Sequence, residues 1–324
     1  MKNKIVALLY QRAGTYVSGQ EMSETLGISR TAVWKHIRVL QQEGYSIEAV
    51  HRKGYRLLRQ QDALLPPEIH EHRMTKWLGK EIVFHETLTS TNLWAKQHVA
   101  TLSHGTIVVA DEQTQGRGRM GRQWDSSKGE GIWMTMVLRP GLPMSDGGKI
   151  TQMAAVAMHQ AIVKATGLSV KIKWPNDLLI DEKKICGILT EMTGELNQIE
   201  HLFVGVGLNV NQKNFPSEIS HTATSLYSAS LHRFSRSRLL AAFLNHFEGY
   251  YDDYVNDQVY APVLEIARSQ SSLLGNAVTV FKGEATFPAT AVQLHEDGRL
   301  EVVYPNGERE LLSGGEVSIR FLDQ

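Results

Sequence analysis

Residues 115–124, Gln-Gly-Arg-Gly-Arg-Met-Gly-Arg-Gln-Trp, constrain the fold of this chain more than any other segment. Its three glycines disfavour both helix and strand, because glycine loses more conformational freedom on folding than any other residue. Its three arginines repel one another unless an anion lies between them. The segment therefore predicts a loop that lies close to a polyanion, and its tryptophan offers a flat face to a base.

A disordered Arg-Gly segment that binds RNA loosely is the alternative for such a composition. The segment occurs once, however, and it lies between apolar runs at residues 106–110 and 132–138. This position favours an ordered ligand-binding loop within a folded domain.

The length of 324 residues predicts two or three domains, and 42% hydrophobic with 21% charged residues is typical of a globular protein. The net charge is zero, but residues 1–60 hold ten Lys and Arg against four Asp and Glu. That surplus of six positive charges leaves a deficit of six in the rest of the chain. The N-terminal end is suited to DNA, and the remainder is acidic.

Cys186 is the single cysteine, so the sequence offers no disulfide framework and no thiolate metal cluster. It lies in an apolar run, and a buried small hydrophobe is a better interpretation than a nucleophile. The apolar run at residues 5–10 is too short for a signal peptide, and no stretch reaches the length of a membrane span. We expect a soluble cytoplasmic protein without zinc, because the histidines lack ligand spacing: His85, His98, His104, His159 and His201.

The first 62 residues have the pattern of a winged helix-turn-helix domain. A helix before Gly14, a second capped by Ser18 and a third from 30 to 43 capped by Ser29 precede a hairpin with a basic tip at residues 51–54. A small helical bundle with a solvated basic face is the alternative. The side chains placed to read or hold DNA are Ser29, Arg30, Thr31, Lys35, His36, Arg38, Arg52 and Lys53.

Residues 59–67 end in a proline pair and predict a linker. A central domain, 63–272, follows, with a mixed α+β sheet carrying helices on one face. Its predicted strands are 82–85, 106–110, 132–138, 171–174, 178–180, 188–193 and 201–208, and its predicted helices are 92–99, 150–166 and 223–254. Short strands with turns at 282–283, 297–298 and 306–307 predict a small β-barrel at 273–324.

Three further polar clusters accompany the Arg-Gly loop. Ser-Thr-Asn at 90–92 is either a helix N-cap or a ligand-binding turn, and Lys-Trp-Pro-Asn-Asp at 173–177 is compatible with a simple tight turn. One lysine of the pair Lys183 and Lys184 is predicted to point inward, where an ammonium group without a carboxylate partner favours a ligand anion. The alternating glycines of residues 205–211 leave room for a ring against the sheet.

The order of these motifs resembles that of the biotin protein ligases. They are Ser-Thr-Asn, then Gln-x-Gln-Gly-Arg-Gly-Arg-x-Gly-Arg-x-Trp, Lys-Trp-Pro-Asn-Asp, Lys-x-x-Gly-Ile-Leu and Gly-x-Gly-x-Asn. The likeness runs from about residue 80 to the C-terminus. With the winged helix in front, the chain resembles the bifunctional bacterial type, both ligase and repressor of biotin synthesis genes. This type has a biotin/lipoate ligase-like catalytic domain and an SH3-like C-terminal domain, in which residues 313–316 would face the ligase site.

The resemblance implies a role for each matching residue. The catalytic residues would be Lys184, Arg117 and Arg119. Biotin would contact Ser90, Thr91, Asn92, Gln113, Arg117, Gly118, Arg119, Lys184, Gly187 and Gly205, and the nucleotide would contact Arg119, Arg122, Trp124, Asn176, Gly207 and Asn209. Met120 departs from the arginine of some members, so a further guanidinium contact is not expected there.

The resemblance also implies the reaction and its partners. Biotin and ATP with Mg²⁺ would give biotinyl-5′-AMP, and biotin would pass to a lysine of a biotin carboxyl carrier protein. A ligand-promoted homodimer would bind operator DNA. Two other functions remain open: a non-catalytic regulator that senses a small acid, and a lipoate ligase on the same fold.

Overall fold

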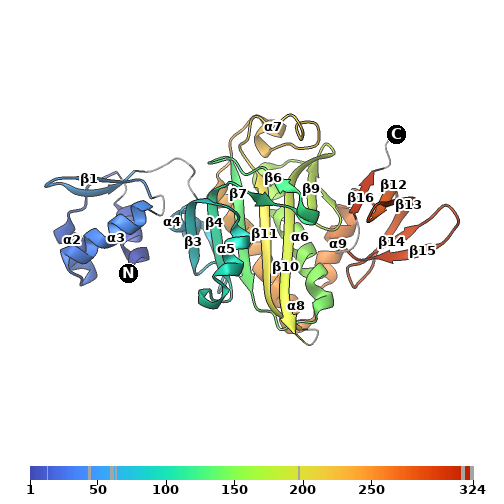
Figure 1. Cartoon of the computed structure of the whole chain (residues 1–324), viewed down its shortest axis with the longest axis horizontal. Coiled ribbons are helices and arrows are strands. Elements are labelled where there is room, and N and C mark those ends of the chain that lie inside the picture. The colour runs from blue at the N-terminus through green and yellow to red at the C-terminus, as the bar shows by residue number, and fades with distance from the viewer. Residues whose placement is uncertain are drawn as a thin grey trace.

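The computed structural model describes residues 1–12, 14–42, 45–58, 62, 64–195, 198–314 and 318–321. A helical head and a C-terminal sheet lie at opposite ends of a larger central domain (Figure 1). The predicted multidomain α+β organisation is confirmed. Within the described part of the chain, none of the helices combines the length and apolar composition that a membrane crossing requires.

The head contains helices and one hairpin in the predicted order. They are α1 (Lys2–Gln11), α2 (Gly19–Leu26), α3 (Arg30–Gln42), β1 (Ile47–Val50) and β2 (Gly54–Leu57). The inner face of α3 is buried, since Val33, Ile37 and Leu40 are at most 1% exposed.

The local signals that define these helices act as predicted. Ser18 Oγ accepts a hydrogen bond from the backbone N–H of Glu21 at 3.0 Å, and Ser29 Oγ accepts one from Ala32 at 3.1 Å. Gly27 ends α2 with a φ of 65°. The predicted winged helix-turn-helix is confirmed, although Glu43, the expected last residue of the third helix, lies outside the described residues.

The entry into the central domain differs from the predicted linker. Pro66 and Pro67 open a helix, α4 (Pro66–His72), because proline has a helical φ and no N–H to leave unpaired. Residues 59–61 and 63 of the predicted linker lie outside the described residues. Asp62 is bound by Arg236, which is 3% exposed: the guanidinium group donates to the carbonyl and carboxylate of Asp62.

The central domain is built on a seven-stranded mixed sheet. Its first two strands in the order below are parallel and the other neighbours are antiparallel. The order is β3 (Ile82–Leu88), β4 (Thr106–Gln113), β7 (Gly131–Leu138), β11 (Gln198–Asn209), β10 (Lys183–Glu195), β9 (Asp177–Ile180) and β8 (Lys171–Lys173).

Helices lie on both faces of this sheet. α6 (Gly147–Thr166), which follows a 3-10 turn (Met144–Asp146), packs on one face beside α8 (Arg236–Asp257). α5 (Thr91–Gln97), followed by the 3-10 turn Val99–Thr101, packs on the other face, where its Ala95 contacts Val108, Val137 and Phe203. The expectation of helices on one face is therefore wrong for α5, and the face it partly covers carries the predicted site.

The predicted helix at 223–254 is in fact two helices. α7 (Leu226–Ser230) ends at Leu231, which has a φ of 60°, and Ser235 then caps α8 by accepting from the N–H of Arg238 at 3.4 Å. Ser225 caps α7 and Ser235 caps α8, and Leu231 between the two helices has a left-handed backbone conformation, which explains the break. The following α9 (Ala261–Ser269) was not predicted.

The C-terminal unit is an antiparallel five-stranded sheet with the order β15-β14-β13-β12-β16. Its strands are β12 (Ala277–Lys282), β13 (Ala285–Leu294), β14 (Leu300–Val303), β15 (Arg309–Leu312) and β16 (Ser318–Phe321). The predicted turns at 282–283, 297–298 and 306–307 fall at or next to the connections between β12, β13, β14 and β15. Among residues 273–314 and 318–321, no pairing joins β15 to β16, so these residues form an open sheet with two free edges where a small barrel was expected.

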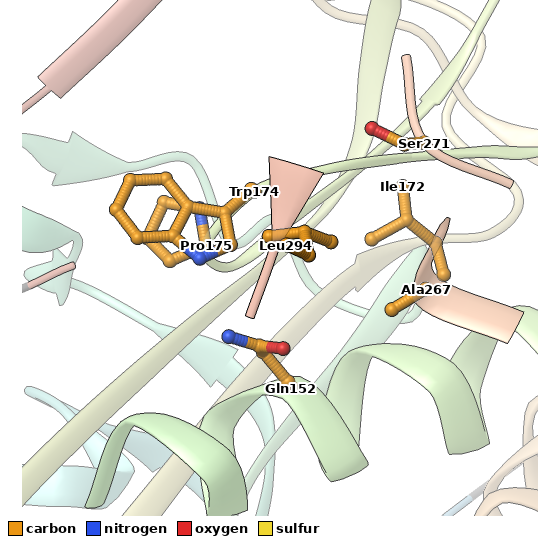
Figure 2. A pocket seen from close by; sticks show the side chains of 7 residues that line it. All are labelled: Gln152, Ile172, Trp174, Pro175, Ala267, Ser271 and Leu294. Atoms are coloured by element: carbon orange, nitrogen blue, oxygen red, sulfur yellow. The ribbon is translucent and has the colours of Figure 1, made fainter. Parts of the chain in front are cut away.

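A small apolar joint connects the C-terminal sheet to the central domain. Figure 2 shows the side chains that line it: Gln152, Ile172, Trp174, Pro175, Ala267, Ser271 and Leu294. The carbonyl of Gly298 accepts hydrogen bonds from Gln152 Nε2 at 2.5 Å and from Trp174 Nε1 at 3.0 Å. Because these donors are buried, the joint fixes the sheet against the Lys-Trp-Pro-Asn-Asp motif.

Candidate active site and DNA-binding groove

Three glycines form a floor on the α5 side of the sheet. Gly187 in β10 pairs with Gly207 in β11, and Gly205 lies two residues earlier on the same face. A Cβ atom on Gly207 would lie 2.6 Å from Trp124 Nε1, and one on Gly187 would lie 2.9 Å from Trp124 Cζ3. The indole therefore rests on the two paired glycines. The predicted room for a ring is present, and the ring that lies there is that of Trp124.

A β-bulge brings Lys184 to the same floor. The register of β10 against β9 shifts between Lys184 and Cys186, which adds one residue, Ile185, to β10. Regular alternation would place Lys184 and Gly187 on opposite faces, since they are three positions apart. The bulge places them together, and Lys184 Nζ would lie 3.1 Å from a Cβ on Gly187.

Lys184 has a carboxylate partner within the protein. Its Nζ lies 2.7 Å from Asp177 Oδ1 and 5.2 Å from the centre of the Trp124 ring. The expected ligand anion is therefore not the only partner available to this lysine, because the protein itself supplies a carboxylate. Lys183 is exposed and Lys184 is half-buried, as the inward orientation of one lysine predicted. Asp177 is half-buried, and its carboxylate also acts electrostatically on Arg119.

The Arg-Gly loop is ordered as a small hairpin. β5 (Gly116–Arg117) pairs with β6 (Gln123–Trp124) around a 3-10 turn (Arg119–Gly121). Gly118 N–H donates to the carbonyl of Arg122 at 2.7 Å and closes the turn. Met120 is 62% exposed with a φ of 55°, so it points away from the floor. The side chains of Arg117 and Arg122 are exposed on the same loop.

Arg119 connects the loop to two other segments. Its guanidinium donates to Asn176 Oδ1 at 2.9 Å and to the backbone carbonyl of Gly314. Burial lowers the pKa of Arg119 from its ordinary value, and the nearby carboxylate of Asp177 opposes this shift. Of the predicted segment 313–316, Gly314 thus reaches the site, whereas Gly315 and Glu316 lie outside the described residues.

A buried polar cluster occupies the other end of the floor. Gln113 Oε1 accepts hydrogen bonds from the backbone N–H of Thr91 at 2.8 Å and from its hydroxyl at 3.1 Å. Asn92 donates through Nδ2 to Leu189 O at 3.2 Å, and its Oδ1 accepts from Thr135 Oγ1 at 2.5 Å. Asn92 is 3% exposed and lies over Gly205, where a Cβ would be 2.3 Å from its Oδ1.

Ser90 acts as a helix N-cap, the alternative that its position allowed. Its Oγ accepts from the backbone N–H of Leu93 at 3.5 Å, while Thr91 and Asn92 open α5 and turn toward the sheet. The cap therefore positions the polar cluster and does not by itself exclude a ligand contact.

Asn209 lies at the end of the floor away from Asn92, and Asn176 lies beside Gly187 and Ile188 of β10. Asn176 Nδ2 donates to Ile188 O at 2.9 Å, and Asn209 Nδ2 donates to Thr224 O at 3.0 Å. Both side chains are less than 10% exposed, so they are held firmly in place.

A separate groove lies between α3 and the β1–β2 hairpin of the head. Of the predicted DNA-binding residues, Arg30, Thr31, Arg38 and Arg52 line it, whereas Ser29, Lys35, His36 and Lys53 do not. Trp34, which was not predicted, also lines the groove and is 50% exposed, with the Arg38 guanidinium 5.4 Å from its ring centre. The sequence contained one indication of this contact: Trp34 precedes Arg38 by four residues, and residues four apart are neighbours on a helix surface.

Sequence reasoning also missed Thr135 and Asp177. Thr135 is fully buried in β7, and the only indication of its role in the sequence is that it is a hydroxyl residue within an otherwise apolar strand. Cys186 is fully buried, and burial raises its thiol pKa, so the predicted apolar role is confirmed. Among the described residues, no cluster of three His, Cys, Asp or Glu side chains is placed to hold a metal ion.

Comparison with known proteins gives two family matches in this chain. The biotin/lipoate A/B protein ligase family matches residues 84–209, and an HTH domain matches residues 2–56. The chain is 38% identical to the bifunctional ligase/repressor BirA of Bacillus subtilis (strain 168), over 97% of this chain and 97% of that protein. It is 25% identical to BirA of Escherichia coli (strain K12), over 99% and 98% of the two chains.

The fold also matches a solved structure. The biotin protein ligase of Aquifex aeolicus in complex with biotin and ATP aligns with a TM-score of 0.67 and 28% identity. The alignment covers 75% of this chain and 100% of that one.

Proposed function

The chain belongs to the family of bifunctional ligase/repressor proteins, and from this membership we propose functions for the head, 1–62, and the central domain, 63–272, which precede a third domain, 273–324. The central domain activates biotin with ATP and transfers it to a lysine of a biotin carboxyl carrier protein. The head binds operator DNA and represses genes of biotin synthesis and transport. The single cysteine fits the reducing cytoplasm in which these partners are found.

The first step joins two anions. A carboxylate oxygen of biotin attacks the α-phosphorus of ATP, pyrophosphate leaves, and biotinyl-5′-AMP remains. Lys184, Arg117 and Arg119 neutralise the repulsion between the reactants and the charge that develops at phosphorus. Support for Lys184 comes from its place on the glycine floor, within 5.2 Å of the Trp124 ring centre.

Mg²⁺ fits this site as an ion that arrives on the phosphates of ATP. Magnesium sites of this kind use one or two carboxylates together with substrate phosphates, and they need no cage of protein ligands. The chain offers the Asp177 carboxylate beside Lys184, and the described residues contain no larger acidic cluster. When bound, the ion would shield the departing pyrophosphate.

Biotin lies at the end of the floor near α5. Hydroxyl and amide groups there suit a ureido ring, which offers one carbonyl and two N–H groups. Thr135 joins the predicted residues because it holds both Asn92 and Thr91. The proposed biotin set is Ser90, Thr91, Asn92, Gln113, Thr135, Arg117, Gly118, Arg119, Lys184, Gly187 and Gly205.

The adenylate lies across the other end. Trp124 offers its face to the base, Gly207 leaves room beside it, and Arg119, Arg122, Asn176 and Asn209 surround the remaining polar groups. One observation carries the whole proposal: Lys184 and Trp124 meet over paired glycines, with the amide side chains of Asn92 and Asn209 at the two ends.

The second step uses the mixed anhydride. The amine of the carrier lysine attacks the biotinyl carbonyl carbon, AMP leaves, and the amine proton is lost to solvent. The Arg-Gly loop keeps water from the anhydride until the carrier arrives, because Arg119 ties it to Asn176 and Gly314.

The head is coupled to this site through a ligand-promoted homodimer. A two-fold dimer would place two heads on a two-fold operator, and adenylate would favour it by stabilising the hairpin of the Arg-Gly loop. Two ion pairs of a single arginine, Arg236, link the end of the head to the central sheet and support this coupling. Arg236 binds Asp62 at the end of the head and Asp111 in β4, two residues before Gln113.

The decisive assay follows labelled biotin onto a biotin carboxyl carrier protein with ATP present. Incorporation that requires ATP supports the ligase, and no incorporation would leave a regulator that only senses a small acid. Footprinting of the operator region with and without biotin and ATP tests the head, and no protection in either state would exclude the repressor role.

Lipoate is the competing substrate, because the matched family includes both kinds of ligase. The Gly-Arg-Gly-Arg loop favours biotin. Excess lipoate in the transfer assay should leave biotin incorporation unchanged, whereas strong competition would reassign the substrate.

A further inference from the structure

Trp34 is the most exposed tryptophan of the chain, and it lies on α3 among basic side chains. Its side chain is 50% exposed, whereas the other five tryptophans are buried or half-buried. An indole left in water forgoes a large gain in free energy, because few side chains bury as much apolar surface. A large ring exposed on the third helix of a helix-turn-helix therefore favours contact with a partner.

The ring is held in place before any partner binds. The guanidinium carbon of Arg38, one helical turn further along α3, lies 5.4 Å from the ring centre. The helix itself is fixed to the β1–β2 hairpin, since Gln41 Nε2 donates to the carbonyl of Ile47 at 2.7 Å. Little conformational freedom is therefore lost when Trp34 meets a ligand.

The groove around Trp34 combines two kinds of surface. Arg30, Arg38 and Arg52 supply guanidinium groups, which suit phosphates and the acceptor atoms of base edges. Among the described residues that line the groove, Trp34 is the one large hydrophobic side chain that is exposed. The groove thus offers cations for the polar parts of DNA and one apolar ring besides.

The edges of the bases carry one apolar group that such a ring fits. In the major groove the base pairs present acceptor atoms and amino donors, and thymine adds a methyl group at C5. The third helix of a helix-turn-helix is the element that lies in the major groove. The exposed indole and this methyl group are therefore matched in polarity and in location.

We propose that Trp34 determines sequence specificity in the head by packing its indole ring against the 5-methyl group of a thymine in the major groove. This inference rests on the proposed DNA binding by the head. The arginines hold phosphates and polar base edges, whereas Trp34 distinguishes thymine from the other bases. Arg38 keeps the ring in the orientation that this contact needs.

The test uses two DNA fragments that differ only in the methyl group. The region upstream of the biotin synthesis genes is prepared once with thymine and once with uracil in its place, primers included. Mobility-shift titrations of the full-length protein, with biotin and ATP present, give a dissociation constant for each. One buried methyl group changes affinity about fourfold, so a two-fold dimer with one contact in each half-site should prefer thymine DNA roughly 15-fold.

Substitutions of Trp34 should change this preference. In Trp34→Ala the ratio of the two dissociation constants should fall to near one, because the ring that contacts the methyl group is gone. Trp34→Phe keeps an aromatic ring on the same helix and should retain most of the ratio. Val39→Ala is the matched control, since Val39 is exposed on α3 but does not line the groove, and its ratio should equal that of the wild type.

The outcomes separate this proposal from the function on which it rests. Equal affinity of the wild-type protein for the two DNAs overturns the role of the methyl group. Loss of affinity by the same factor for both DNAs in Trp34→Ala also overturns it, and would assign Trp34 to phosphate contact or to support of Arg38. Wild-type protein that shifts neither DNA would instead refute DNA binding by the head.

Discussion

The ammonium nitrogen of Lys184 lies 2.7 Å from a carboxylate oxygen of Asp177. The two side chains are 33% and 21% exposed, so solvent reaches the pair and screens part of its attraction. An incoming phosphate therefore competes with Asp177 for the same ammonium group. Asp177 holds the lysine in place above the glycine floor until the anionic substrates arrive.

Removal of this ammonium group should stop the first chemical step. Lys184→Ala should reduce biotin-dependent pyrophosphate release by roughly 100- to 1,000-fold, because one charge that stabilises the transition state is lost. Lys183→Ala, one residue earlier and exposed, is the control and should behave as the wild type. Near-normal release from Lys184→Ala would contradict the catalytic assignment.

The glycine floor should tolerate no side chain under Trp124. In Gly207→Ala the new Cβ would meet the indole at 2.6 Å, which forces the ring to move. We expect the KM for ATP to rise about tenfold through lost stacking, with biotin affinity retained in calorimetry. Gly249→Ala, where a Cβ meets nothing within 4 Å, should leave both quantities unchanged. A normal KM for ATP in Gly207→Ala would separate the ring from nucleotide binding.

Thr135 should matter to biotin although it was not predicted. Thr135→Val removes the hydroxyl that bonds Asn92 and leaves the amide oxygen less satisfied, so biotin affinity should fall about tenfold in calorimetry. Thr106→Val is the matched control, because Thr106 is equally buried but bonds Glu81 at the far end of its strand. Equal affinities in the two variants would refute a role for Thr135 in the biotin pocket.

Arg119 should control the retention of the adenylate. Arg119→Ala breaks the contacts with Asn176 and Gly314, so we expect pre-formed biotinyl-5′-AMP to escape at least tenfold faster in a filter-binding chase. Arg119→Lys should also release the adenylate faster than the wild type, but less so than Arg119→Ala. The positive charge remains, whereas one ammonium group cannot bond both acceptors in the same geometry. An unaltered escape rate in Arg119→Ala would show that the loop is held by other residues.

Acid should destabilise the protein partly through His159. Burial lowers the pKa of this histidine from 6.5, and its Nε2 lies 3.1 Å from the carbonyl of Val170. The unfolded chain therefore takes up a proton below pH 6.5 that the folded protein refuses, and stability falls as the pH drops through that range. In His159→Gln the loss of melting temperature between pH 7.5 and 5.5 should be smaller than in the wild type. An identical loss would assign the acid response to other groups.

Local signals explain why much of the fold was predictable. Ser18, Gly27 and Ser29 delimit the helices of the head through contacts with their immediate neighbours, so sequence suffices to find them. The break at Leu231 is different, because a left-handed leucine has no sequence signature and the serines beside it were overlooked as caps.

The candidate site was predictable as motifs but not as geometry. Alternation alone would turn Lys184 away from Gly187, and only the bulge at Ile185 brings the two together. A bulge depends on pairing with a neighbouring strand and is invisible in a single segment. The same holds for Asp177 and Thr135, whose partners lie in other strands or helices.

The contact from the C-terminal sheet to Arg119 is made by the backbone carbonyl of Gly314. Since every residue type carries this carbonyl, no point substitution at 314 deletes the acceptor itself; only displacement of the chain does. A Cβ at 314 would lie 2.8 Å from Pro175, so even alanine there would push the chain away from the motif that carries Asn176. The hydrogen bond from Arg119 to Gly314 thus depends on where the whole C-terminal unit lies. Sequence comparison of side chains alone would not reveal that dependence.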